Sequence, residues 1–127
     1  MNMNVSLNIE ITPKHVHDLM VTSFEGISGD WLNQVNPISE VPETGEGLVW
    51  WGREAFWNTD WSIELVTHED GTKLLKREDF LSAMQEAVKR PADLRDVMTW
   101  VYDGDDWDAL VANNLLQVAV FGEVVFG

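Results

Sequence analysis

The first pattern along the chain is an alternation of apolar and polar residues. The apolar positions of residues 5–11 are Val5, Leu7, Ile9 and Ile11, with polar residues between them, which predicts a half-buried strand. Thr12 and Pro13 follow, and this pair is typical of a helix N-cap and first helical position. A helix over residues 13–25 is predicted because apolar residues then recur at helical spacing until Gly26: Val16, Leu19, Met20 and Phe24.

The middle of the chain predicts a small antiparallel sheet. Residues 27–34 favour a further short helix, capped by Ser28 or Asp30, with Trp31 turned inward. Residues 36–47 contain two prolines and two glycines, and they predict an exposed loop. Strands are expected over residues 48–51, 61–67 and 72–75. The pair Asp70-Gly71 between the last two indicates a tight hairpin turn in which both residues have positive φ.

The last third of the chain predicts three helices. The first carries apolar residues from Phe80 to Val88, the second starts at Pro91 and ends before Gly104, and the third is capped by Asp105 or Asp106 and ends at Gly122. Residues 123–126 are expected as a short strand or a packed tail.

Asn114 falls on the apolar stripe of the third of these helices, so it should find a hydrogen-bond partner, with the backbone as the expected one. Taken together, residues 1–127 predict one α+β domain, with an antiparallel sheet of three or four strands packed against four or five helices.

The tryptophans suggest a binding surface. The segment VWWGREAFWNTDW, residues 49–61, holds four of the seven tryptophans. On an extended strand Trp50 and Trp51 point to opposite faces, so the two rings are not expected to share one core. Three arrangements follow: helices cover one face and another subunit the other, the other face holds a ligand, or Trp51 lies half-exposed over a neighbour. Arg53 lies among these rings, where it can stack on an indole, contact an anionic ligand or neutralise a nearby acid. The candidate binding residues are Trp50, Trp51, Arg53, Trp57 and Trp61, and packing in the core is the competing interpretation.

Charge limits the possible partners. The chain carries 22 acidic and 8 basic residues, a net charge of −14. Such a surface repels phosphate backbones and anionic lipids, so we expect neither direct nucleic-acid binding nor membrane association. Residues 53–95 hold seven of the eight bases together with nine acids, whereas the two flanks are almost entirely acidic and would form one negative face if they meet. The chain has no cysteine, no apolar run long enough for a membrane span and no leader-like start, which predicts a cytoplasmic protein.

Catalytic and metal motifs are weak. His15 and His17 lie on opposite sides of the predicted helix and cannot share an ion. The acidic run at residues 103–108, DGDDWD, has Asp108 and Asn114 where a calcium loop needs glycine and glutamate. His68 lies at a predicted turn, where solvated polar residues are common. We therefore expect no catalytic residue, no metal ion and no cofactor, and the chain is not predicted to be an enzyme.

Two segments carry a resemblance to a known family. LMVTSFEGISGDWL (residues 19–32) and LLQVAVFGEVVFG (residues 115–127) resemble small uncharacterised proteins encoded mainly by bacteriophages and prophages, many of which end in L-Q-x-A-x-F-G-E-V-V-[FY]-G. The chain departs from their pattern at Ile27, Ser28 and Asp30. The resemblance implies a mobile-element origin and no particular activity.

The function predicted first is that of a non-enzymatic binding protein, which contacts a host protein or sequesters a small nucleotide-like ligand. A homodimer is one form that the protein contacts can take. One alternative is an acidic nucleic-acid mimic that inhibits a host DNA- or RNA-binding enzyme. A second alternative is a small enzyme of unknown reaction.

Overall fold

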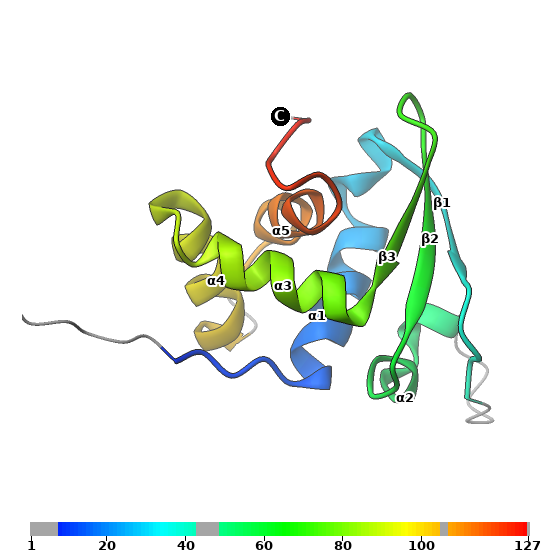
Figure 1. Ribbon diagram of the computed structural model, residues 1–127, viewed down its shortest axis with the longest axis horizontal. Coiled ribbons are helices and arrows are strands. Elements are labelled where there is room, and N and C mark those ends of the chain that lie inside the picture. Colours follow the sequence, from blue (N-terminus) through cyan, green and yellow to red (C-terminus); the bar gives the residue numbers. More distant parts are fainter. Residues whose placement is uncertain (1–7, 43–48, 105–106, 127) are drawn as a thin grey trace, which may run out of the picture.

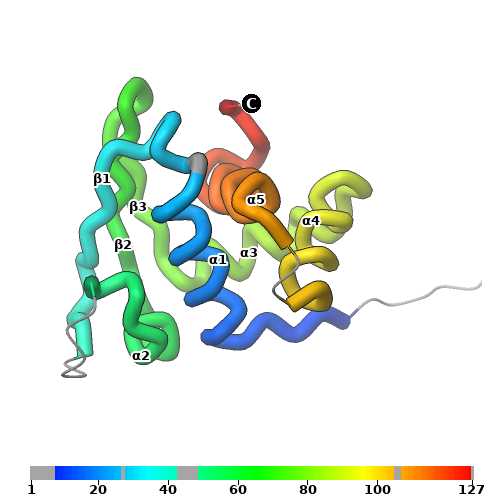
Figure 2. Tube along the Cα trace, turned by 180° about the vertical axis from the view of Figure 1, so that it is seen from behind, coloured from blue at the N-terminus to red at the C-terminus, as the bar shows by residue number. Residues whose placement is uncertain are grey.

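The computed structural model describes residues 8–42, 49–104 and 107–126, and it has the predicted α+β architecture. A three-stranded sheet forms one side of the molecule and helix α4 (Pro91–Tyr102) forms the opposite side (Figure 1). Between them lie α1 (Pro13–Glu25), α3 (Arg77–Ala87) and α5 (Ala109–Phe121), as the view from behind also shows (Figure 2). In the described part of the chain, no helix has the length and apolarity that crossing a membrane requires.

Helix α1 begins where the sequence predicts, with a capping box that uses histidine. The Thr12 side chain accepts a hydrogen bond from the backbone N–H of His15, and the backbone N–H of Thr12 donates to His15 Nδ1 at 3.0 Å. Two N–H groups at the helix start are thereby satisfied. His15 therefore has a structural task in the first turn of α1.

The sheet has the order β1-β2-β3, and both pairs are antiparallel. Strands β2 (Ser62–Thr67) and β3 (Thr72–Lys76) confirm the two strands predicted around Asp70-Gly71. Strand β1 (Leu32–Pro37) replaces the end of the helix predicted over residues 27–34 and the start of the predicted loop. Only Ile27–Asp30 is helical there, as the 3-10 turn η1, and Trp31 is buried as expected.

The hairpin turn between β2 and β3 is wider than predicted. Only Gly71 has a positive φ, because the ladder stops at Val66 and Thr72 and leaves five residues in the turn. The Thr67 hydroxyl donates to Gly71 O at 2.7 Å and accepts from Asp70 N at 2.8 Å. These hydrogen bonds of the Thr67 side chain stabilise the five-residue turn, which is longer than the predicted two-residue turn.

Helix α5 is the central helix and packs against α1, α3 and α4. Its sequence, ALVANNLLQVAVF, is apolar on most sides, which is typical of a helix surrounded by others. Its N-cap is Asp108, whose carboxylate accepts from Val111 N, so Trp107 precedes the helix; the predicted caps Asp105 and Asp106 lie outside the described residues. Gly122 ends it with a φ of +81°, as predicted.

The C-terminal residues form a packed tail. The side-chain oxygen of Gln117, a buried residue of α5, accepts from Val125 N at 2.8 Å and from Phe126 N at 2.7 Å. Its amide nitrogen donates to Phe126 O at 2.9 Å. The Phe126 ring then stacks on Trp31, with the two planes 3° apart.

Asn113 is the second buried polar residue of α5, in addition to Gln117. Its Oδ1 accepts from Trp31 Nε1 at 2.7 Å and from Ser28 Oγ at 3.1 Å. Asn114, which the sequence analysis placed on the apolar face, is only half-buried, and its partner is the Asp96 carboxylate at 3.4 Å rather than the backbone. Helix α5 therefore turns Asn113, and not Asn114, toward the core.

Two predicted strands are wrong in the part that the structure describes. Residues 8–11 are extended but pair with no strand, and Ile9 and Ile11 instead pack against the helical core. Residues 49–51 enter the 3-10 turn η2 (Trp50–Gly52), which leads into the short helix α2 (Glu54–Trp57). Alternating side chains alone do not make a strand, because a strand also needs an edge with which to pair.

Gly26, between α1 and η1, provides a stability prediction. A Cβ atom at this position would lie 2.6 Å from Thr22 O and 3.0 Å from the Cβ of Ala109. We expect Gly26→Ala to lower the free energy of unfolding by about 1–3 kcal/mol, because backbone must shift to relieve the clash. Gly29→Ala is the matched control, since a Cβ there meets no atom within 4 Å. Urea unfolding measures both, and equal losses would contradict the packing at Gly26.

Candidate functional site

The predicted tryptophan site is mostly the aromatic core of the protein. Trp57 lies between Trp50, Phe56 and Trp61, with ring centroids 6.2, 4.9 and 5.0 Å away. From Trp61 the series continues through Phe80, Trp100 and His15, at 6.0, 6.0 and 6.2 Å. Trp57 and Trp61 are each only 1% exposed, so their rings form packing contacts and present no surface to a large partner.

Trp50 and Trp51 retain some exposure but both pack within one protomer. Trp50 contacts Phe56 at 5.1 Å, and Trp51 contacts Phe24 of α1 at 5.8 Å. The Trp51 carbonyl also accepts a hydrogen bond from Trp57 Nε1 at 2.9 Å. The prediction that Trp50 and Trp51 point to opposite faces depended on a strand over residues 48–51, where the structure has the 3-10 turn η2. Of the three arrangements, the half-exposed position of Trp51 over a neighbour, Phe24, is the one that the structure shows.

Arg53 fixes the segment that carries these rings. Its Nη1 donates to Pro42 O at 3.2 Å, which joins the chain after β1 to the start of α2. On the other side, His17 Nε2 lies 3.1 Å from Gly52 O. Trp50, Trp51 and Arg53 therefore form a half-buried surface whose main contacts are within the fold.

A second hollow lies between α1 and the end of α4, and its charges satisfy one another. It has two parts of about 310 and 220 Å³, both lined by Lys14, Asp18 and Trp107. Lys14 Nζ and His17 Nδ1 contact the Asp18 carboxylate at 2.8 and 2.9 Å. Burial acts to raise the pKa of Asp18, but the hydrogen bonds from Lys14 and His17 outweigh it and lower the pKa. The network is complete without a ligand.

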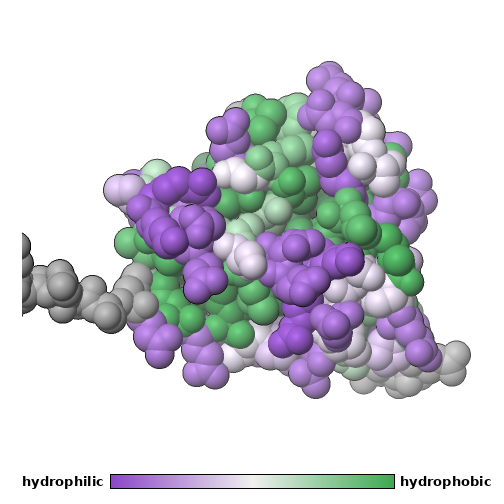
Figure 3. Space-filling model, in the orientation of Figure 1, coloured by the Kyte–Doolittle hydropathy of each residue, from purple (hydrophilic) through white to green (hydrophobic). Residues whose placement is uncertain are grey.

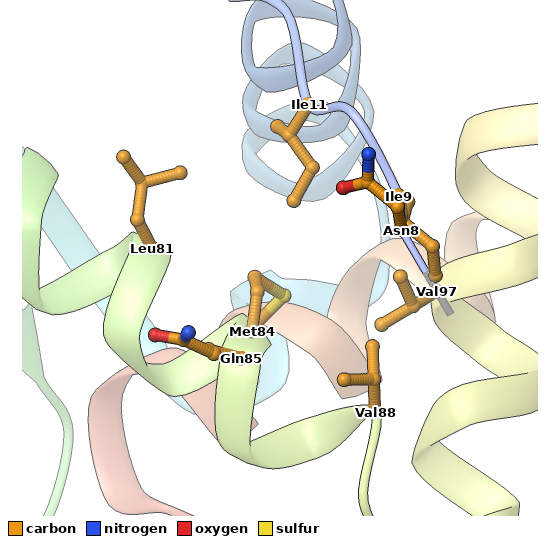
Figure 4. A pocket seen from close by; sticks show the side chains of 8 residues that line it. All are labelled: Asn8, Ile9, Ile11, Leu81, Met84, Gln85, Val88 and Val97. Atoms are coloured by element: carbon orange, nitrogen blue, oxygen red, sulfur yellow. The ribbon is translucent and has the colours of Figure 1, made fainter. Parts of the chain in front are cut away.

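A further hollow is a groove between the N-terminal segment and α3, lined by six apolar and two polar side chains. Its volume is about 340 Å³, within the range of small-molecule sites. Three lining residues come from α3, one is the valine that follows it, one is a valine of α4, and three come from the N-terminal segment: Leu81, Met84, Gln85, Val88, Val97, Asn8, Ile9 and Ile11. Their side chains surround an open centre (Figure 4), and the molecular surface there is apolar, at the lower left of Figure 3.

The groove adjoins a small recess, and one of the residues that line this recess has a buried polar atom without a partner. Ile11 and Leu81 line both hollows, and the recess of about 30 Å³ is also lined by Trp61 and Arg77. Trp61 Nε1 is the only buried side-chain nitrogen or oxygen in the described chain without a hydrogen-bond partner. A buried N–H without an acceptor costs free energy, so Trp61 Nε1 is a destabilising feature of the aromatic core.

Metal-binding clusters are missing from the described residues: no three histidine or acidic side chains there are grouped to hold an ion. Asp103 and Asp108 are the two ends of the acidic run at residues 103–108. The other two acids of the run, Asp105 and Asp106, are outside the described part. His68 Nε2 lies 3.1 Å from Gly29 O at the exposed end of the hairpin, so its contact is with a backbone carbonyl group. His15 and His17 each contact separate backbone groups.

Comparison with known proteins adds no relative. No protein-family model matches this chain, and neither the curated proteins nor the solved structures provide a match. The resemblance to phage and prophage proteins thus stays a prediction.

The groove was not predictable as a site from the sequence, and of the predicted binding residues only Trp57 and Trp61 line the recess that adjoins it. One signal was present: Leu81, Met84 and Val88 have i, i+3, i+7 spacing, on a helix that also has Phe80 and Ala87 for the core. A helix with apolar residues on two adjacent faces has more apolar surface than one contact can cover. The N-terminal alternation supplied the opposite wall, but it was interpreted as a strand.

Proposed function

We propose that this protein is a non-enzymatic binding protein that sequesters a small, largely apolar molecule in the groove between the N-terminal segment and α3. The single observation that carries the proposal is the groove itself, a hollow of ligand size lined by six apolar side chains and by the polar side chains of Asn8 and Gln85. Small-molecule sites combine an apolar lining with a few polar groups that fix orientation. The groove has both features, whereas the hollow beside Lys14 has charges that already pair.

The different exposure of the residues that line the groove also supports ligand binding. Met84 at its base is 1% exposed and belongs to the core, whereas Leu81 at its rim is 37% exposed. The base is therefore rigid and the rim accessible. A ligand would cover the apolar rim and gain about 25 cal/mol for each Å² of apolar surface removed from water.

A neutral probe tests this proposal. We expect 1-octanol to shift the methyl resonances of Ile9, Leu81 and Val88 in two-dimensional NMR spectra, in a saturable manner. Leu81→Asp should weaken its binding about tenfold or more, because a carboxylate at the rim would have to lose water. Leu110→Asp is the matched control: Leu110 is 53% exposed, is also helical and does not line the groove.

Octanol that binds both variants equally, or that shifts residues scattered over the surface, would refute the proposed groove function. Either result would show that the apolar hollow does not act as a site.

The acidic nucleic-acid mimic is the second candidate. Helix α1 of the first acidic flank packs against α5 of the second, and Gly26 lies close to Ala109, but α5 itself carries no acidic residue. A mimic's complex with its target would weaken steeply with added salt, whereas binding in an apolar groove would tolerate salt. A host-protein partner, a homodimer, a cytoplasmic location and a small enzyme stay predictions from the sequence.

A further inference from the structure

The polar side chains of the groove are both amides. Among the described residues that line it, only Asn8 and Gln85 are polar and none is charged. Asn8 belongs to the N-terminal segment and Gln85 to α3, so each wall carries one amide group (Figure 4). An amide side chain accepts hydrogen bonds through its oxygen and donates them through its nitrogen. These walls therefore offer a ligand both kinds of hydrogen bond without a charge.

Both amides are available to a ligand. Asn8 and Gln85 are exposed, and neither side chain forms a hydrogen bond with another described residue. The buried amide of Gln117 differs, because its oxygen and nitrogen are both bonded to the C-terminal tail. A ligand in the groove would thus compete only with water for the two exposed amides.

The charged residues that follow Gln85 pair with one another. Glu86 lies 3.0 Å from Lys89, and Arg90 lies 2.7 Å from Asp93 where the chain passes into α4. An ionic head group on a ligand would have to lose water on entering the groove, and these pairs offset little of that cost. The surroundings of Gln85 therefore favour a neutral head group.

The position of Gln85 on α3 places its amide beside apolar surface. Leu81 lies four residues before it, at the spacing of neighbours on one helical face, and Val88, the C-cap residue, lies three residues after it. Met84, at the base of the groove, directly precedes it. An aliphatic body that covers Leu81 and Met84 would bring an attached head group to Gln85.

We infer that the groove binds an aliphatic molecule with a neutral amide head group, which pairs with the side-chain amide of Gln85. The inference rests on the proposed groove function and names its ligand class. Two amides can form two hydrogen bonds, because each has a donor and an acceptor side by side. A carboxylate only accepts and an ammonium group only donates, so neither ion can form this pair.

The test compares four ligands with the same chain length: octanamide, 1-octanol, octanoate and octylammonium. Calorimetry at pH 7 and about 0.15 M salt measures their affinities with long-range charge screened. We expect octanamide to bind about three- to tenfold more tightly than 1-octanol, through the second hydrogen bond. Both ions should bind on the order of tenfold more weakly than 1-octanol.

Two glutamine variants locate the head group. Gln85→Met should lower the affinity for octanamide to that for 1-octanol, because it keeps the length of the side chain and removes the amide. Gln34→Met is the matched control, since Gln34 is an exposed glutamine of β1 that does not line the groove. The side-chain amide signals of Gln85 in ¹H–¹⁵N spectra, assigned by their loss in Gln85→Met, should shift with octanamide.

The outcomes separate the ligand class from the groove function. If 1-octanol binds in the groove but octanamide binds no more tightly, or either ion binds as tightly as octanamide, the neutral-amide assignment is overturned while the groove function stands. Equal effects of Gln85→Met and Gln34→Met would also overturn it, as would a preference that Asn8→Leu removes and Gln85→Met does not. Failure of all four ligands to bind refutes the groove function itself.

Discussion

Trp57→Ala lowers the free energy of unfolding by about 3–5 kcal/mol, the largest loss that we expect from one substitution. The Trp57 ring is fully buried between Trp50, Phe56 and Trp61, so its removal leaves a cavity that three rigid rings cannot fill by small movements. The substitution also deletes the hydrogen bond to Trp51 O, which holds η2 against α2.

Urea unfolding followed by far-ultraviolet circular dichroism measures this loss without depending on tryptophan fluorescence. Trp51→Ala is the matched control, because Trp51 belongs to the same segment but is half-buried and has Phe24 as its ring neighbour. We expect its loss to be about 1–2 kcal/mol, in proportion to the smaller apolar area that it buries. If Trp51→Ala cost as much as Trp57→Ala, the aromatic core would not be centred on Trp57.

Asn113→Ala should be the second most destabilising change, with an expected loss of about 2–4 kcal/mol. The Asn113 side-chain oxygen accepts from Trp31 Nε1 and Ser28 Oγ, and both donors are buried. Ser28 can turn its hydroxyl group toward Ser23 Oγ, 2.6 Å away, but the indole N–H has no such alternative. The cost therefore comes mainly from a buried donor that is left without an acceptor.

The adjacent residue gives the control. Asn114→Ala removes only a 3.4 Å contact with Asp96 from a half-buried position, and it should cost less than about 1 kcal/mol. Thermal unfolding of both variants at the same pH distinguishes the two asparagines. Equal losses would contradict the orientation of α5, because they would place Asn114 and not Asn113 in the core.

Local signals predicted the helices well. Thr12-Pro13, Pro91 and Gly122 mark boundaries through the conformations that their own backbones and side chains prefer, and the structure uses all three at those places. Asp108 shows the limit of this reasoning. Several acids in residues 103–108 were suitable caps, and the choice among them depends on how Trp107 and α5 pack against the rest of the molecule.

Strands were less predictable because pairing is a property of two segments. The sequence LNQVNP has little preference for extended structure, yet it forms β1 because the edge of β2 is available beside it. Residues 8–11 have the better alternation but meet helices instead, and they become one wall of the groove. The competing partner, not the intrinsic preference of either segment, decided both outcomes.

The candidate site also combines features that the sequence predicts with features that only tertiary contacts decide. The aromatic content of residues 49–61 was visible in the sequence, but burial separated the half-exposed Trp50 and Trp51 from the buried Trp57 and Trp61. The sequence does not single out Arg77, since only the pairing of β2 with β3, which sets Ser62 opposite Lys76, places it in a recess with Trp61.

By itself, the sequence determined the α+β class, the start of α1, the β2–β3 hairpin, the ends of the last two helices and the strongly acidic charge. These features depend on periodicity, backbone preferences and composition, which act over a few residues or add along the chain. The tertiary structure alone decided which segment became β1, which asparagine of α5 is buried and where the groove lies. Each of these depends on contacts between distant segments, whose free energies no single stretch of sequence contains.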